Sequence, residues 1–139
     1  MSAVFVDIWA WYALADEKDT DHDLARLASD ELINRATALV TTNFVLDEAT
    51  TLIRHKLGHS PAVTFRKTVR QLADDGLLII VRINETHENS AGEIFDRYAD
   101  QDFSFTDCAS FVVMREMELT EVFTGDQHFG TLGFTLIPS

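Results

Sequence analysis

Near its start the chain reads Ala3-Val-Phe-Val6, an apolar run that stops at the acid Asp7. A short apolar segment that ends at a charged residue is typical of a buried strand in a parallel sheet. Four later segments have the same character, and we expect further strands at residues 39–41, 77–83, 122–124 and 134–137. Parallel pairing of such strands requires crossover connections, which are usually helices.

Amphipathic patterns fill the gaps between these strands. Two of them place apolar residues at the i, i+3, i+4, i+7 spacing of a helix face. The stripes consist of Val45, Leu46, Ala49, Leu52 and Ile53, and of Ala91, Ile94, Phe95 and Tyr98. Helices alternating with strands predict a three-layer α/β/α domain with a mainly parallel sheet of about five strands. Ligands of such sheets bind at the carboxyl ends of the strands.

The composition fits one globular domain over residues 1–139. The chain has 46% hydrophobic and 24% charged residues, with only six Gly and two Pro, which excludes disordered and collagen-like classes. Its single cysteine, Cys108, excludes a disulfide framework and a multi-cysteine zinc site. We expect no membrane span, because residues 77–81 are the longest aliphatic run. We expect a cytoplasmic location, because the chain does not open with a basic segment and a long apolar run.

Charge is unevenly distributed along the chain. A net charge of −12 by itself argues against a polyanionic partner. However, residues 49–73 contain no acidic residue, and they carry five basic ones: Arg54, Lys56, Arg66, Lys67 and Arg70. These five form a candidate phosphate-binding surface, although a solvated helix face fits them at least equally well.

Two consecutive helices are expected to meet within this basic stretch. Gly58 fits the C-cap of the first helix, Ser60 the N-cap of the second, and Pro61 its first residue. Three apolar and three basic residues then occupy opposite faces of the second helix: Phe65, Val69 and Leu72, against Arg66, Lys67 and Arg70.

Two acids follow predicted strands. Asp7 comes directly after the first strand, and Asp126 follows residues 122–124 with one glycine between them. Because parallel strands end at the same edge of a sheet, both carboxylates are expected at that edge. Either residue alone is equally well explained as a turn or helix N-cap, a position where Asp is common.

Two further acids lie on predicted helices. Glu48 falls on the rim of the apolar stripe that contains Val45 and Ala49, whereas Asp47 points to the opposite side. A rim Glu that reaches water is the structural explanation. Asp107 belongs to Ser104-Phe-Thr-Asp107, a capping box with Asp in place of Glu, and capping alone would account for it.

Four segments, in this order, resemble the PIN-domain ribonucleases and most closely the small VapC-like toxins of toxin–antitoxin pairs. They are Val4-Phe-Val-Asp7 with Ala10-Trp-Tyr-Ala-Leu14, Thr41-Thr-Asn-Phe-Val-Leu-Asp-Glu48, Asp102-Phe-Ser-Phe-Thr-Asp107-Cys-Ala-Ser-Phe-Val-Val-Met114, and Thr124-Gly-Asp126-Gln-His-Phe129 with Gly133-Phe134. Each motif is weak alone, but together they cover essentially the whole chain at the family's spacing.

The resemblance implies a catalytic, metal-binding quartet of acids: Asp7, Glu48, Asp107 and Asp126. Because four converging carboxylates repel one another, they need a cation, and oxygen ligands without Cys or His favour Mg²⁺ or Mn²⁺. The implied reaction is hydrolysis of RNA to a 5′-phosphate and a 3′-hydroxyl. Asn43, Asp102 and Thr124 are candidates for hydrogen bonds around the metal ligands. His128 could contact substrate, but a structural role is the more common one for such a residue.

The resemblance also implies partners. These are an RNA substrate, a cognate basic antitoxin that inhibits the enzyme, and a second copy of the chain. The ten Phe residues are numerous for so small a domain, which is consistent with apolar surface left for a homodimer interface.

Two alternatives remain open at the level of sequence. The family usually has a hydroxyl residue or Asn after its first Asp, whereas Ile8 and Trp9 follow Asp7 here. This departure favours a catalytically weakened PIN-like module that binds RNA or protein. A phosphoacceptor signalling domain is disfavoured, because Asp7 has no adjacent acid and Lys67 is the last lysine.

Overall fold

The computed structural model describes residues 2–138 and contains a five-stranded sheet. The strands are β1 (Ala3–Val6), β2 (Ala38–Thr42), β3 (Leu78–Val81), β4 (Glu121–Phe123) and β5 (Thr135–Ile137). They pair in the order β3-β2-β1-β4-β5, and every pair is parallel. The predicted α/β class is confirmed, and each predicted strand segment overlaps an observed strand.

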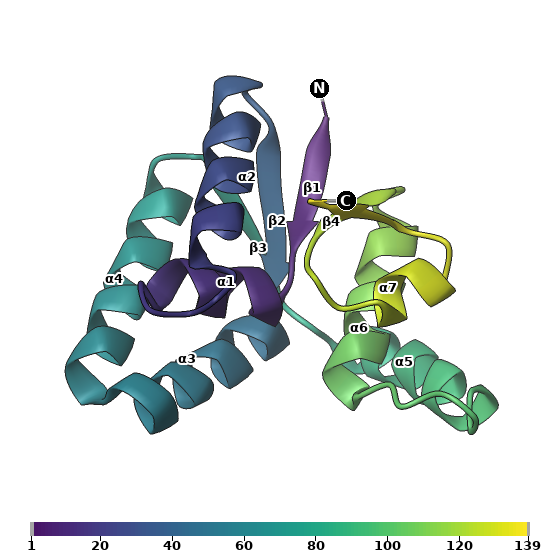
Figure 1. Ribbon diagram of the computed structural model, residues 1–139. Coiled ribbons are helices and arrows are strands. Elements are labelled where there is room, and N and C mark those ends of the chain that lie inside the picture. Colours follow the sequence, from purple (N-terminus) through teal and green to yellow (C-terminus); the bar gives the residue numbers. More distant parts are fainter. Residues whose placement is uncertain (1, 139) are drawn as a thin grey trace.

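Helices cover both faces of this sheet (Figure 1). They are α1 (Ile8–Ala15), α2 (His22–Asn34), α3 (Asn43–Leu57), α4 (His59–Asp74), α5 (Glu85–Arg97), α6 (Phe105–Glu116) and α7 (His128–Thr131). In Figure 1, α1 to α4 lie on one side of the strands and α5 to α7 on the other. The strand order accounts for this division, because crossovers of one hand place their helices on opposite faces when the chain moves outward from β1 to β3 and then returns to β4 and β5.

An aromatic cluster fixes α6 and α7 to the sheet. Phe111 of α6 and Phe129 of α7 are fully buried, with ring centroids 5.0 Å apart. Phe129 also lies 6.4 Å from Phe5 of β1 and 6.4 Å from Phe134. Burial of large aromatic side chains dominates the energetics of such a core. The cluster therefore holds α7, and the loop that precedes it, in a defined position beside β1.

The junction between α3 and α4 differs from its predicted form. Gly58 is the C-cap of α3, as expected, but it is also the N-cap of α4, with φ at 109°. The predicted N-cap Ser60 is therefore wrong, because α4 already begins at His59 and Ser60 lies in its first turn. A φ in this region strains residues with a Cβ, so glycine suits the direct connection between the two helices.

The apolar stripe predicted on α5 is only partly buried. Ala91 and Ile94 belong to the core, as expected, but Phe95 is 49% exposed. Its ring lies 6.2 Å from Phe105 at the start of α6.

Among residues 2–138, we find no helix that combines the length and the apolar character needed to cross a bilayer.

Candidate active site

Two of the predicted acids lie at the carboxyl ends of neighbouring strands. Val6 of β1 pairs with Phe123 of β4, and the Asp7 amide donates a hydrogen bond to the Phe123 carbonyl (3.2 Å). The Thr124 hydroxyl donates to Asp7 Oδ2 (3.0 Å) and accepts a hydrogen bond from the Asp126 amide (3.0 Å). Thr124 therefore connects the two acidic segments directly.

Asp7 is a buried carboxylate whose charge is only partly compensated by hydrogen bonds. Its side chain is the N-cap of α1 but makes no capping hydrogen bond, so capping does not explain it. Within residues 2–138, Asp7 Oδ1 is buried and has no hydrogen-bond partner. Burial raises the pKa of Asp7 to about 7; the charges of Asp107 and Asp126 also raise it, while hydrogen bonds from Ile8 and Thr124 lower it. Such a group is costly unless a cation faces it.

Asp107 forms the predicted capping box at the start of α6. Its backbone amide donates to Ser104 Oγ, and the Ser104 amide donates to Asp107 Oδ2, both at 3.0 Å. Burial raises the pKa of Asp107 above its usual value, and the Asp126 charge adds to this, while contacts with Ser104 and His128 oppose it. Asp107 therefore caps the helix and faces the other acids at the same time.

His128 lies between two of these acids. Its Nδ1 is 3.2 Å from Asp107 Oδ2 and 3.3 Å from Asp126 Oδ1. Ligand atoms of Asp107, Asp126 and His128 all lie within 4.8 Å of one another, a spacing that suits a metal ion. His128 was considered only as a substrate contact, because its approach to Asp107 depends on the fold. The available signal for a role at the acidic site was its position two residues after Asp126.

Glu48 lies beside this cluster but outside it. It is an exposed residue of α3, and its Oε1 accepts a hydrogen bond of 2.5 Å from the Thr106 hydroxyl, next to Asp107. The structure therefore brings Asp7, Asp107 and Asp126 together and places Glu48 on the rim.

The three residues predicted to support the metal ligands occupy different places. Thr124 contacts both acidic segments, as described above. Asn43 instead accepts a hydrogen bond from the Ile83 amide (2.7 Å), at the end of β3. Asp102 is exposed in the loop before α6.

Trp9 packs against the turn that carries Asp126. A Cβ added to Gly125 would lie 2.5 Å from the Trp9 indole, so only glycine fits beside this ring. Trp9 also makes an edge contact with Phe123, at a centroid distance of 6.5 Å. The unusual residue after Ile8 thus shapes the turn between β4 and α7.

We expect Gly125→Ala to lower the free energy of unfolding by about 1–3 kcal/mol, because overpacking displaces Trp9 or the turn. Denaturant titration would measure this. Gly92→Ala is the control: its helical site is open, and the gain in helix propensity is expected to be below about 1 kcal/mol. Equal stabilities of Gly125→Ala and wild type would refute the close packing.

The basic residues separate into two groups. Arg66 and Arg70 of α4 line a polar cleft of about 470 Å³ together with Arg82, which lies outside the predicted basic set. Asp47 lies in the same cleft, on the side of α3 away from Glu48. Of the others, Lys56 lies 5.1 Å from the Tyr12 ring centroid, Arg54 contacts His59, and Lys67 is exposed on α4.

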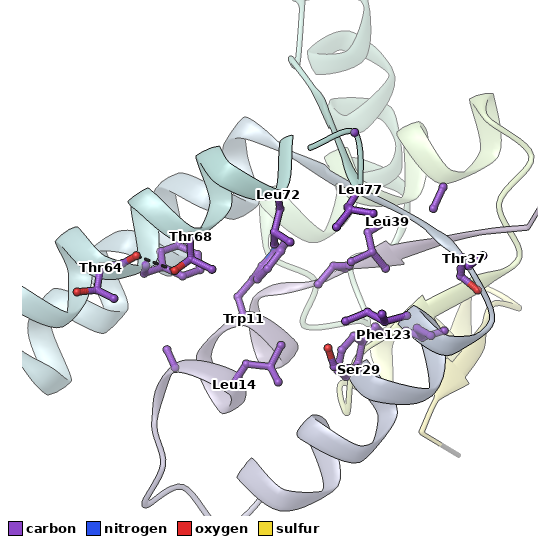
Figure 2. Close-up of a pocket in the computed structure, with 18 of the residues that line it drawn as sticks. Trp11, Leu14, Ser29, Thr37, Leu39, Thr64, Thr68, Leu72, Leu77 and Phe123 are labelled. Atoms are coloured by element: carbon purple, nitrogen blue, oxygen red, sulfur yellow. Dashed lines mark hydrogen bonds between the residues drawn. The ribbon is translucent and has the colours of Figure 1, made fainter. Parts of the chain in front are cut away.

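An apolar groove of about 730 Å³ runs between α2 and α4 (Figure 2). Its floor includes Leu39 of β2 and Phe123 of β4, and Trp11, Leu72 and Leu77 lie along it. Val6, the residue before Asp7, also lines it. The groove therefore reaches the strand ends from which the acids project.

Most of the chain is similar to known nucleases. A family model described as the PIN domain matches residues 4–134. The 23S rRNA-specific endonuclease VapC20 of Mycobacterium tuberculosis is 30% identical over 134 residues, which is 94% of this chain and 95% of the relative. A VapC ribonuclease of Archaeoglobus fulgidus is 29% identical over 119 residues, covering 84% of this chain and 73% of the relative.

Solved structures agree with this assignment. The crystal structure of M. tuberculosis VapC20, described as a sarcin-ricin loop cleaving toxin, has a TM-score of 0.84 and 27% identity, and the match covers 96% of this chain and 97% of that one. FitAcB from Neisseria gonorrhoeae has a TM-score of 0.68 at 12% identity, over 96% and 95% of the two chains, and supports the fold alone. The chain belongs to the PIN-domain family, and its homologues include VapC ribonucleases.

Proposed function

We propose that this chain is a Mg²⁺- or Mn²⁺-dependent endoribonuclease that acts as the toxin of a toxin–antitoxin pair. The observation that carries the proposal is the meeting of Asp7, Asp107 and Asp126 at one sheet edge, with a buried carboxylate oxygen of Asp7 that lacks a partner among the described residues. The names of the VapC relatives support RNA as the substrate.

The donors at this edge fit a divalent cation. Asp7, Asp107 and Asp126 would hold it, because carboxylate oxygens suit Mg²⁺ and Mn²⁺ and the ion would offset their mutual repulsion. When bound, a divalent ion supplies a water of lowered pKa and stabilises charge on a phosphodiester. Thr124 orients Asp7 by its hydrogen bond, and Asp107 is fixed by its capping box.

Glu48 has a separate part in this proposal. Because Glu48 Oε1 is held by Thr106, the carboxylate is directed toward the Asp107 end of the site while remaining open to water. Its second oxygen can accept a hydrogen bond or a proton from a water at the mouth of the site. This makes Glu48 the fourth member of the catalytic set.

A cleavage assay tests the proposal. Purified protein should cut single-stranded and structured RNA in the presence of Mg²⁺ or Mn²⁺. Cleavage should stop when EDTA is added. Binding of RNA without cleavage in either metal would instead favour the catalytically weakened module.

The basic cleft is the proposed contact for RNA phosphates outside the cleavage position. Arg66, Arg70 and Arg82 offer positive charge on the opposite side of α3 from Glu48. A strand that crosses α3 would pass from the acids to these arginines. Because Arg contacts to phosphate release counterions, binding through this cleft should depend on salt.

We expect the double variant Arg66→Ala/Arg70→Ala to raise KM for RNA by roughly tenfold while changing kcat little, and to reduce the salt dependence of binding. Arg26→Ala, an exposed arginine on α2, is the control. Steady-state kinetics at two ionic strengths would measure both effects. An unchanged KM would exclude the cleft from the RNA path.

In this proposal, an apolar segment of the antitoxin binds in the groove between α2 and α4. We choose this occupant because the groove continues to Val6, so a bound segment leads toward the acids. There a basic side chain of the antitoxin can pair with two carboxylates in place of the metal.

Coexpression with the product of the adjacent small reading frame tests this arrangement. The partner should copurify with wild type but not with Leu77→Glu, which puts a charge in the groove. Ile79→Glu is the matched control: Ile79 is 49% exposed and Leu77 50% exposed, but Ile79 is not part of the groove lining. If the partner copurifies with both variants, the antitoxin does not bind in this groove.

A homodimer remains part of the proposal. Phe95 and Phe105 are adjacent and 49% and 38% exposed, and a second copy of the chain would cover them. Sedimentation should give a dimer at micromolar concentration, and a monomer there would contradict it.

A further inference from the structure

We propose that His128 is a metal ligand, which adds a nitrogen donor to the acidic site and makes it bind Mn²⁺ in preference to Mg²⁺. This inference rests on the metal site of the proposed function. It assigns a role to a residue outside the acidic quartet.

The distances around His128 match those between neighbouring metal ligands. Ligands in an octahedral shell lie about 2.1 Å from the ion, so adjacent donors are separated by roughly 3 Å. Nδ1 of His128 is 3.2 Å from Asp107 Oδ2 and 3.3 Å from Asp126 Oδ1. All three donors can therefore contact one ion with little rearrangement.

The position of the imidazole is set by its surroundings. The His128 amide donates to Asp126 Oδ1 (2.9 Å), which ties the backbone of His128 to this acid. On the other side the ring packs edge-on against the buried Phe103, at a centroid distance of 5.2 Å. These contacts point Nδ1 at the two carboxylates, and the side chain remains 30% exposed, so the site is open to solvent.

Asp7 extends this three-donor group toward the sheet. Its carboxylate is coupled electrostatically to both Asp107 and Asp126. Its buried Oδ1 has no hydrogen-bond partner among residues 2–138. This observation supports a bound cation independently of the distances around His128. The resulting donor set is three carboxylates and one imidazole.

A nitrogen donor changes which cations are preferred. Mg²⁺ binds oxygen ligands and retains water, whereas imidazole suits transition metals. In a site with one imidazole, Mn²⁺ gains a bond that Mg²⁺ uses poorly. Removing the imidazole should therefore weaken Mn²⁺ binding by roughly tenfold or more, and Mg²⁺ binding by less than about threefold.

Pulsed electron paramagnetic resonance of the Mn²⁺-loaded protein tests the assignment. The wild-type spectrum should contain the coupling of a directly bound ¹⁴N nucleus. The coupling should disappear in His128→Gln and persist in His55→Gln, which alters an exposed histidine on α3. Circular dichroism checks that each variant is folded, and calorimetry gives the Mg²⁺ and Mn²⁺ affinities.

The outcomes separate this inference from the proposed function. Mn²⁺ that binds without nitrogen coupling in the wild type overturns the assignment of His128 and leaves the carboxylate site in place. Coupling that survives in His128→Gln also overturns it. If the wild type binds neither Mn²⁺ nor Mg²⁺, the metal site of the proposed function fails as well.

Discussion

Replacing Asp7 with Asn is expected to abolish RNA cleavage and, without metal, to make the protein more stable. Loss of a direct ligand should lower the rate by at least about 100-fold. The stabilisation arises because Asp7 is buried beside two other acids, which raise the cost of its negative charge.

The size of this stabilisation depends on pH. A folded-state pKa of about 7 against 3.8 means that the folded protein holds the Asp7 proton more tightly than the unfolded chain does. Stability is therefore lost as the pH rises from 4 to 7, up to on the order of 4 kcal/mol. Because the buried Asn amide is itself costly, we expect a net gain of roughly 2 kcal/mol at pH 8 and none near pH 4.

Thermal unfolding of metal-free protein at pH 4 and pH 8 would measure this difference. Asp30→Asn, an exposed acid on α2, is the control and should change little at either pH. Mg²⁺ should stabilise the wild type and leave Asp7→Asn unchanged. Wild-type cleavage by the variant, or lower stability at pH 8, would contradict the assigned role of Asp7.

Of the proposed substitutions, Phe129→Ala is expected to lower the free energy of unfolding most. Phe129 is fully buried and contacts the rings of Phe5, Phe111 and Phe134. Its truncation should cost about 3–5 kcal/mol, because a cavity remains where the ring was. Since Phe129 follows His128 directly, the turn that carries Asp126 should also lose its position, and cleavage should fall with stability.

Denaturant unfolding and a metal-binding assay would measure both effects. The control is Leu27→Ala on α2, which removes a side chain that is 65% exposed and should cost less than about 1 kcal/mol. A cost below about 1 kcal/mol for Phe129→Ala would mean that the aromatic cluster does not anchor α7.

Much of the fold was predictable because its signals are local. The apolar run before Asp7 and the segments at residues 39–41 and 122–124 are strands, as expected, and the structure adds that the first lies between the other two. The capping box of Ser104 and Asp107 was also readable, since both partners lie three residues apart. Asp7 and Asp126 were expected at one sheet edge, and they come close together because the strands before them are paired neighbours.

Other features depend on contacts between distant segments. No helical stripe predicts α1, because this helix is apolar on several sides. His128 gains its position from Asp107, and Arg82 joins Arg66 only where β3 ends beside α4. Glu48 was placed on a helix rim correctly, but its hydrogen bond to Thr106 depends on the contact between α3 and α6.

The departure at Ile8 and Trp9 also has a structural explanation. The Trp9 ring fills the space beside Gly125, where a Cβ would not fit, so the large residue after β1 requires the glycine after β4. The residue that directly follows β4, Thr124, provides a hydroxyl that donates a hydrogen bond to Asp7, although no hydroxyl residue follows Asp7 itself. The weakened-module alternative thus loses part of its only support.

Identification of the RNA ends left by cleavage tests the central claim most directly. If a metal-activated water attacks the phosphodiester, each cut should leave a 5′-phosphate and a 3′-hydroxyl, and the products should vanish with EDTA or with Asp126→Asn. Cleavage that continues in EDTA and leaves 2′,3′-cyclic phosphates would show that the ribose hydroxyl is the nucleophile, and it would contradict the account.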